Sequence, residues 1–220
     1  NNKKEITRAE RLHKQMQIYA KNIHSLWLDK DNSLWLGLFL KGALHYIPHL
    51  NRTVDYNLLS EEVSSGFCII EDKNDHIWYG GPSGLFLIDK KKANSRPEKI
   101  SSLRVFNLVQ FNDSILWAGT RKGSIFQINT HTLKVTSLPI LPHTDLYITY
   151  IYPDSHQRIW IGTDNNGLYV SDRNGSIIAF YSKEQLGSNA IKGIIEDEMS
   201  NVWVLSLIHI SEPTRQAEIS

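Results

Sequence analysis

Residues 151–168 read IYPDSHQRIWIGTDNNGL, and this stretch decides the fold because its pattern recurs along the chain. Five of the six tryptophans follow one another at intervals of 43, 39, 43 and 43 residues: Trp35, Trp78, Trp117, Trp160 and Trp203. A glycine stands two residues after the tryptophan in four units, at Gly37, Gly80, Gly119 and Gly162. An aspartate stands six residues before it in four units, at Asp29, Asp72, Asp154 and Asp197. Aligned columns at a fixed period indicate a repeat protein.

Each repeat reads as a set of short β-strands. Residues 147–189 contain apolar runs rich in Ile, Tyr, Val and Trp, which are separated by clusters of Asp, Asn, Gly and Ser. The runs follow one another too closely for helices to lie between them. Four strands in roughly 40 residues are typical of one β-propeller blade. The sequence therefore predicts an all-β fold, a partial β-propeller of about four four-stranded antiparallel blades with the start of a fifth.

The repeat also sets the expected boundaries. The predicted blades are 22–64, 65–103, 104–146 and 147–189, with a partial fifth at 190–204. Residues 1–21 are either the end of a preceding blade or an irregular lead-in. The repeat predicts a glycine at position 205, but Leu205 stands there and the pattern does not resume. Residues 205–220 resemble the translation of a sequencing adapter, so we predict that they are a non-native tail.

The repeated residues have expected structural roles. The aspartate opens a tight turn and accepts backbone N–H groups, and the tryptophan fills the wedge between neighbouring blades. The first glycine permits close approach of backbone, and a second glycine, six or seven residues after the tryptophan, provides a positive φ: Gly42, Gly84, Gly123 and Gly167. The third unit lacks the aspartate and has Phe111 at that position.

The pattern I-x-x-I-x-x-D-x-x-x-x-I-W-I-G-T-x-x-x-G-L, best seen between Ile148 and Leu168, resembles the two-component regulator propeller repeat. This family resemblance implies the periplasmic sensor region of a Bacteroidetes-type hybrid two-component histidine kinase, an inner-membrane protein whose kinase would lie outside this chain. It also implies recognition of glycan-derived signals and a homodimer of the full-length parent. The expected partners are the remaining propeller blades of that parent and an oligosaccharide ligand.

Composition and motifs argue against catalysis by this chain. The formal charge is +1, from 24 basic and 23 acidic residues, which favours neither nucleic acid nor membrane as a direct partner. The single cysteine, Cys68, excludes a disulfide framework within the chain, and its apolar surroundings predict a buried, inert thiol. His45 and His49 have a spacing that binds metal on a helix, but Pro48 breaks a helix there. We expect no catalytic residue, no metal and no cofactor.

Candidate ligand-binding residues lie on the loops between the second and third strands of the blades, which crowd one rim of a propeller. They are Lys41, Ser83, Arg121, Lys122, Asp164 and Asn165. They differ from blade to blade, as expected of a recognition rim in a non-catalytic sensor. Two alternatives stay open: part of a propeller enzyme, either a lyase or a glycan-active protein, and a propeller scaffold that binds proteins.

Overall fold

A computed structural model describes residues 22–56, 65–92, 95–120, 123–138, 141, 146–172, 174–207 and 217–219. The roles predicted for residues 1–21, Arg121 and Lys122 lie outside these ranges. Within them nearly all regular structure is β-strand, so the all-β prediction is confirmed. The chain forms two compact units, one of residues 1–71 and 75–102 and the other of residues 72–74 and 103–220.

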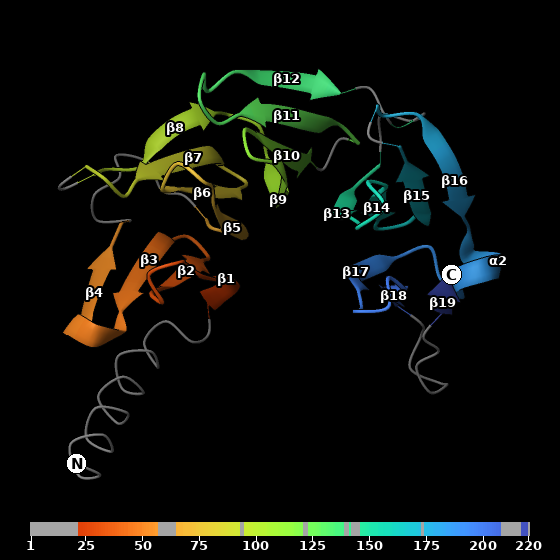
Figure 1. The fold of residues 1–220 in the computed structure, drawn as a ribbon, viewed down its shortest axis with the longest axis horizontal. Helices are drawn as coiled ribbons and strands as arrows, with labels where there is room; N and C mark the ends of the chain where they lie inside the picture. The colour runs from red at the N-terminus through yellow and green to blue at the C-terminus, as the bar shows by residue number, and fades with distance from the viewer. Residues whose placement is uncertain are drawn as a thin grey trace, which may run out of the picture. The chain divides into compact units, whose positions relative to one another are not determined.

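The first unit contains two antiparallel four-stranded sheets (Figure 1). Sheet 1 consists of β1 (Ile23–Leu28), β2 (Leu34–Leu38), β3 (Gly42–Ile47) and β4 (Arg52–Asp55), with a 3-10 turn, η2 (Pro48–Leu50), before β4. Sheet 2 consists of β5 (Cys68–Glu71), β6 (His76–Gly81), β7 (Gly84–Asp89) and β8 (Glu98–Ser101).

The second unit contains three further sheets. Sheet 3 consists of β9 (Val105–Asn112), β10 (Ile115–Thr120), β11 (Ile125–Asn129) and β12 (Val135–Leu138). Sheet 4 consists of β13 (Ile148–Pro153), β14 (Ile159–Thr163), β15 (Leu168–Ser171) and β16 (Ile177–Tyr181). Sheet 5 consists of β17 (Ile191–Glu196), β18 (Val202–Ser206) and β19 (Ala217–Ile219).

Within each sheet, strands that follow one another in the chain pair with each other, so each sheet is a simple up-and-down meander. The strands of sheets 1 to 4 lie within residues 22–64, 65–103, 104–146 and 147–189, respectively. Sheet 5 reaches into residues 205–220, because β18 ends at Ser206 and β19 pairs with β18. The non-native origin of that segment stays a prediction. One short helix was not predicted, α2 (Lys183–Leu186), which follows sheet 4 and ends at Gly187 with a φ of 79°.

Three of the repeated tryptophans pack against the next sheet of their own unit. Trp35 lies in a buried cluster with Ile69, Ile77 and Tyr79 of sheet 2. Trp117 packs in the same way on sheet 4, and Trp160 packs on sheet 5. All three indoles are at most 3% exposed, so each fills the space between two sheets, as predicted.

The first repeat glycine lets the sheets approach closely. A Cβ on Gly162 would lie 2.6 Å from Cγ2 of Ile191, at the start of β17. A Cβ on Gly119 would lie 2.8 Å from Cγ2 of Ile148, at the start of β13. Carbon atoms do not approach so closely, so only glycine fits at these positions without a shift of the isoleucine side chains. The second repeat glycine has a positive φ, as predicted, of 58° at Gly42 and 76° at Gly167.

Candidate functional site

The repeat aspartate organises the turn between the first two strands of a blade. Oδ1 of Asp29 accepts the backbone N–H groups of Asp31 at 3.0 Å and Ser33 at 2.9 Å. Its Oδ2 accepts the Ser33 hydroxyl at 2.7 Å and the Trp35 indole N–H at 3.0 Å. The turn role was predicted, but the bond to the indole was missed. The constant spacing of six residues between the aspartate and the tryptophan was the signal that could have revealed it.

The same arrangement recurs in the second unit. Asp154 accepts the indole N–H of Trp160 at 2.8 Å, and Asp197 accepts that of Trp203 at 2.9 Å. Sheet 3 differs. Phe111, which replaces the aspartate, stacks on Trp117 with ring centroids 4.8 Å apart and planes at 16°. The buried Nε1 of Trp117 finds no acceptor among the residues that the structure describes.

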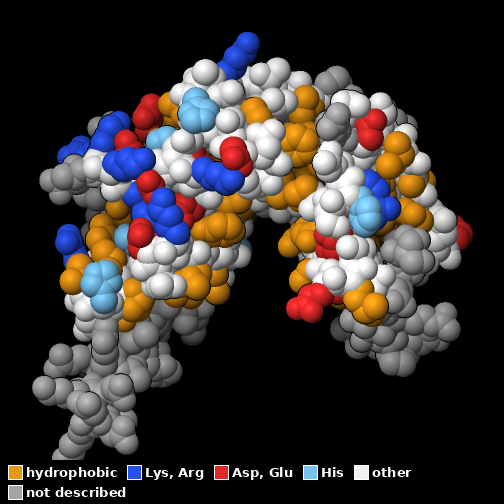
Figure 2. All heavy atoms as spheres, in the orientation of Figure 1, with side chains coloured by type: hydrophobic (Ala, Val, Ile, Leu, Met, Phe, Trp, Pro, Cys, Tyr) orange, Lys and Arg blue, Asp and Glu red, His pale blue; other side chains and the backbone are white. Residues whose placement is uncertain are grey.

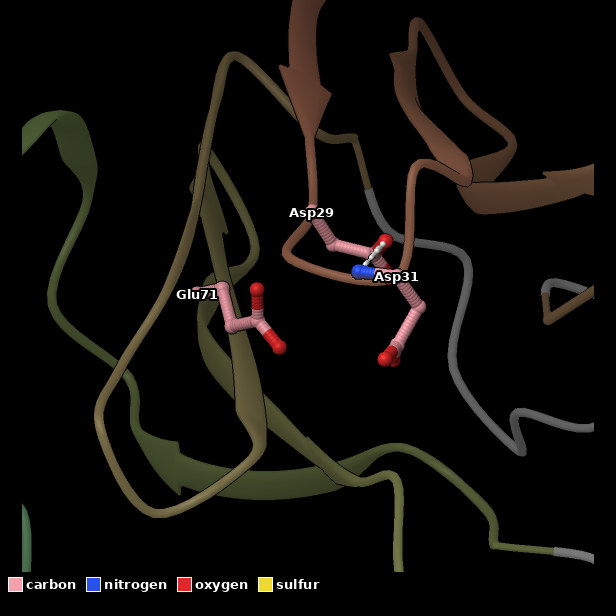
Figure 3. A group of neighbouring side chains, drawn as sticks. All are labelled: Asp29, Asp31 and Glu71. Carbon is pink, nitrogen blue, oxygen red and sulfur yellow. Dashed lines mark hydrogen bonds between the residues drawn. The ribbon is translucent and has the colours of Figure 1, made fainter.

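A cluster of charges joins sheet 1 to sheet 2 beside the Asp29 turn. Asp29 and Asp31 come from the β1–β2 turn and Glu71 from the end of β5, and their carboxylates converge (Figure 3). The Lys90 ammonium lies among them, 2.7 Å from Asp29 Oδ2, 2.7 Å from Asp31 Oδ2 and 2.8 Å from Glu71 Oε1. Glu71 Oε2 also accepts the backbone N–H of Lys30 at 3.1 Å.

The charges of this cluster reinforce one another. Burial raises the pKa of Asp29, but hydrogen bonds from Lys90, Ser33 and Trp35 outweigh burial and hold the pKa well below its usual range. Burial lowers the pKa of Lys90, but its bonds to the carboxylates outweigh this and raise the pKa above its usual value. These two groups therefore stay ionised near pH 7 and cannot exchange protons with a substrate there.

Three carboxylates within 4.8 Å of one another would also suit a divalent cation. Here the three N–H donors of the Lys90 ammonium match the three carboxylates. The surface of the first unit mixes basic and acidic side chains (Figure 2). Near the cluster, Lys30 and Lys91 form ion pairs with Asp75. We assign the cluster to the joining of two sheets.

Glu196 of the second unit has the same role as Glu71. Both stand seven residues before their tryptophan, at the end of the first strand of a sheet. Oε2 of Glu196 accepts the backbone N–H of Ser155 at 2.8 Å, and Oε1 accepts the Ser155 hydroxyl at 2.6 Å. The sequence reading missed these bonds between sheets. The signal in the sequence was a glutamate directly before the repeat aspartate in two of the five units, Glu71 before Asp72 and Glu196 before Asp197.

His45 and Cys68 are packed rather than poised for chemistry. The His45 ring stacks on Trp35 at 4.0 Å, and its Nε2 lies 2.6 Å from the Ser33 hydroxyl oxygen. Burial lowers the pKa of His45 to about 4, so the ring is neutral at pH 7. The Cys68 side chain is buried, and burial raises the pKa of its thiol to about 12. Such a thiol is a poor nucleophile at neutral pH.

The described rim candidates lie on turns between second and third strands. Lys41 is half-buried in the β2–β3 turn, Ser83 is half-buried in the β6–β7 turn, and Asn165 is exposed after β14. The structure brings Asp164 together with Lys192 of the next sheet, with Oδ1 2.6 Å from Nζ. Ligand binding by these residues stays a prediction.

An aromatic group beside Lys41 was missed by the sequence reading. Phe39, in the same β2–β3 turn, is 42% exposed, and its ring centroid lies 5.7 Å from that of His24 on β1. Phe67 lies 4.6 Å from His24 and is stacked with Phe39 at 6.1 Å. We call His24, Phe39 and Phe67 the rim aromatic group. Exposed rings beside a lysine provide both an apolar face and a charge for a ligand.

The sheets define the chain as a β-propeller, and solved structures of that fold resemble it. The extracellular domain of the putative one component system BT4673 from B. thetaiotaomicron superposes with a TM-score of 0.71 at 23% identity. The match covers 84% of this chain and 26% of that one. The extracellular domain of the putative hybrid two component system BT3049, from the same organism, has a TM-score of 0.64 at 17% identity over 84% of this chain and 26% of that chain.

Sequence comparison adds a match to a family model and one relative. Residues 143–165, which include β13 and β14, match the family model of the two component regulator propeller, so the predicted resemblance is confirmed for these residues. Histidine kinase P4 of Formosa agariphila is 26% identical over 177 residues, which cover 71% of this chain and 13% of the relative. The chain thus spans a small part of the length of its relatives. Among the described residues, no helix has both the length and the apolar character needed to cross a membrane.

Proposed function

We propose that this propeller is a non-catalytic signal-recognition part of a two-component regulatory protein, located outside the cytoplasm, and that it recognises glycan-derived signals. The match of residues 143–165 to the two component regulator propeller carries the proposal. The names of the similar proteins support it, because they describe extracellular domains of one- and two-component systems and a histidine kinase. A histidine kinase in the parent protein and the periplasmic location of this propeller are both parts of the proposal.

The rim residues support recognition of a polyhydroxylated ligand. Sugars offer hydroxyl groups to charged side chains and an apolar ring face to aromatic side chains. Asp164 and Lys192 offer the first kind of contact on sheets 4 and 5, and Phe39 with its neighbour Lys41 offers both kinds on sheet 1. The ionisable groups of the Lys90 cluster are engaged with one another and support no acid–base role.

The test is a binding screen of the 220-residue chain against oligosaccharides released from plant, algal and host polysaccharides. Isothermal titration is expected to identify at least one ligand class, and its affinity is expected to fall about tenfold or more in Phe39→Ala or Asp164→Ala. Met199→Ala is the matched control, because Met199 is 82% exposed in the β17–β18 turn, at the opposite end of its sheet from the rim.

The possible outcomes separate the parts of the proposal. Binding with no loss in either rim variant would remove the rim from the site. No binding across the panel would overturn glycan recognition. Release of new reducing ends or unsaturated products by the wild-type chain would show a propeller enzyme and overturn the non-catalytic part.

A further inference from the structure

The β14–β15 turn of sheet 4 is held in one conformation by its own hydrogen bonds. The Thr163 hydroxyl donates to the Gly167 carbonyl at 2.8 Å and accepts the Asn166 backbone N–H at 2.9 Å. The Gly167 N–H donates to the Asn189 carbonyl at 2.9 Å, which ties the turn to the segment before sheet 5. The Asn166 side-chain amide also donates to the Tyr169 hydroxyl at 2.9 Å. A turn that is fixed before a ligand arrives loses little conformational entropy on binding.

Two residues at the tip of this turn keep polar atoms available. Asp164 and Asn165 are both exposed. Oδ1 of Asp164 pairs with the Lys192 ammonium, whereas its Oδ2 and the side-chain amide of Asn165 have no hydrogen-bond partner among the described residues. A carboxylate oxygen accepts hydrogen bonds, and an amide both donates and accepts them. A rigid turn with unengaged polar atoms at its tip is the arrangement expected of a ligand contact.

Tyr147 lies directly beside this turn and was not among the predicted rim residues. The Asp164 N–H donates to the Tyr147 carbonyl at 2.9 Å, and this bond continues the pairing of β13 with β14 one step beyond Ile148 and Thr163. Residues opposite each other on antiparallel strands extend their side chains on the same face, so Tyr147 and Asp164 are side-chain neighbours. Tyr147 is 46% exposed, although sheet 4 packs against sheet 3 on one side and sheet 5 on the other.

This set of groups distinguishes free sugar hydroxyl groups from sulfated ones. An aromatic ring packs on the apolar face of a pyranose, and a carboxylate beside it accepts hydrogen bonds from hydroxyl groups of the same sugar ring. Replacement of those hydroxyl groups by sulfate esters removes the donors and places negative charge against Asp164. The Lys192 ammonium, 2.6 Å from Oδ1 of Asp164, is already paired, so it offers a sulfate little uncompensated charge.

We propose that Tyr147, Asp164 and Asn165 form a subsite for one unsulfated sugar ring that carries two neighbouring free hydroxyl groups. The Tyr147 side chain packs on the ring face, Oδ2 of Asp164 accepts one hydroxyl group, and the Asn165 amide bonds to the second. Lys192 is a positioning residue, because its ion pair fixes the Asp164 carboxylate. The inference rests on the proposed function, and it adds the residue that contacts the sugar ring and the substitution pattern of the ligand.

The experiment uses one neutral oligosaccharide from the binding screen in two forms, unmodified and chemically sulfated. Isothermal titration of the 220-residue chain is expected to show about tenfold or more weaker binding of the sulfated form. Tyr147→Ala is expected to weaken binding of the unmodified form about tenfold or more, whereas Tyr147→Phe retains the ring face and is expected to change it less than about threefold. Asp164→Asn is expected to weaken binding of the unmodified form and to reduce the difference between the two forms, because the negative charge is gone.

A matched pair of asparagines controls for general effects of surface substitution. Asn165→Ala is expected to weaken binding of the unmodified form, because its amide bonds to the ligand. Asn174→Ala is expected to leave binding unchanged. Both asparagines are exposed, but Asn174 lies in the β15–β16 turn, at the opposite end of sheet 4 from the rim. Equal losses in the two variants would overturn the contact assigned to Asn165.

The remaining outcomes separate this inference from the proposed function. Binding of the sulfated form that equals or exceeds binding of the unmodified form would overturn the requirement for free hydroxyl groups. A loss in Phe39→Ala without a loss in Tyr147→Ala would move the ring contact to the rim aromatic group and overturn the subsite. Both results leave glycan recognition intact. No binding of any oligosaccharide in the screen would overturn the proposed glycan recognition, and the subsite with it.

Discussion

The contrast between Trp117 and Trp160 provides a matched pair of substitutions in one unit. Both indoles are almost fully buried, at 3% and 1% exposure, but only Trp160 donates its N–H to an aspartate, 2.8 Å away. Replacement of either residue by phenylalanine removes the same atoms and leaves a similar space. We therefore expect the apolar part of the cost to cancel, and the difference in unfolding free energy to report the fate of the N–H group.

The magnitude follows from hydrogen-bond energetics. Trp160→Phe loses a hydrogen bond to a charged acceptor, worth about 1.5–3 kcal/mol, whereas Trp117→Phe removes an unpaired buried donor that costs the native state about 1–3 kcal/mol. The two energies add when the variants are compared. We expect their sum at the lower end of its range, because Arg158 Nε, 2.5 Å from Asp154 Oδ2, still donates to the carboxylate when the indole is gone. Trp160→Phe is therefore expected to destabilise the second unit by about 3 kcal/mol more than Trp117→Phe does.

The assay is urea unfolding followed by far-UV circular dichroism, since tryptophan fluorescence changes with the substitution itself. With a urea m value of about 2 kcal/mol/M, the two midpoints are expected to differ by about 1.5 M. Asp154→Asn, alone and combined with Trp160→Phe, completes a double-mutant cycle and isolates the coupling between the two side chains. Equal midpoints for the two tryptophan variants would refute the reasoning, as would a larger loss in Trp117→Phe.

Three further outcomes are expected. Lys90→Met leaves three carboxylates facing one another and should destabilise the first unit by about 3–5 kcal/mol. Wild type should lose stability as the pH falls below about 4, because the pKa of Asp29 is depressed on folding, whereas the variant should gain stability between pH 7 and 5. Urea unfolding of both proteins over this pH range is the test, and the same pH dependence in both would contradict the role of the cluster. His45, whose pKa is lowered to about 4, should contribute stability that is present above about pH 6.5 and lost as the pH falls toward 4, and its ring protons should titrate near pH 4 in NMR spectra; a midpoint near 6.5 would contradict its packing on Trp35. Cys68, with its thiol pKa raised to about 12, should react with a thiol reagent only after unfolding, and rapid labelling of the native chain at pH 8 would contradict its burial.

The period of the tryptophans was sufficient to predict the strands, the four-stranded sheets and the family resemblance. Such features are local, because strand pairing, turn chemistry and the alternation of buried residues are all specified within about 40 residues of chain. Close packing at Gly162 and the positive φ of Gly167 were predicted by the same reading, whereas Ile191 as the partner of Gly162 was not. The rim loops were placed by the same logic, but nothing local says what they bind.

Only the tertiary structure could decide how successive sheets are joined. Lys90 lies 61 residues from Asp29 and 19 from Glu71 in the chain, and no periodic pattern predicts that one ammonium lies among three carboxylates. The stacking of Phe111 on Trp117 and the rim aromatic group were likewise not predicted from the sequence. The physical reason is that the contacts between sheets depend on strand twist and on the distance between sheets, and these are set by packing across the interface rather than by neighbours in the chain.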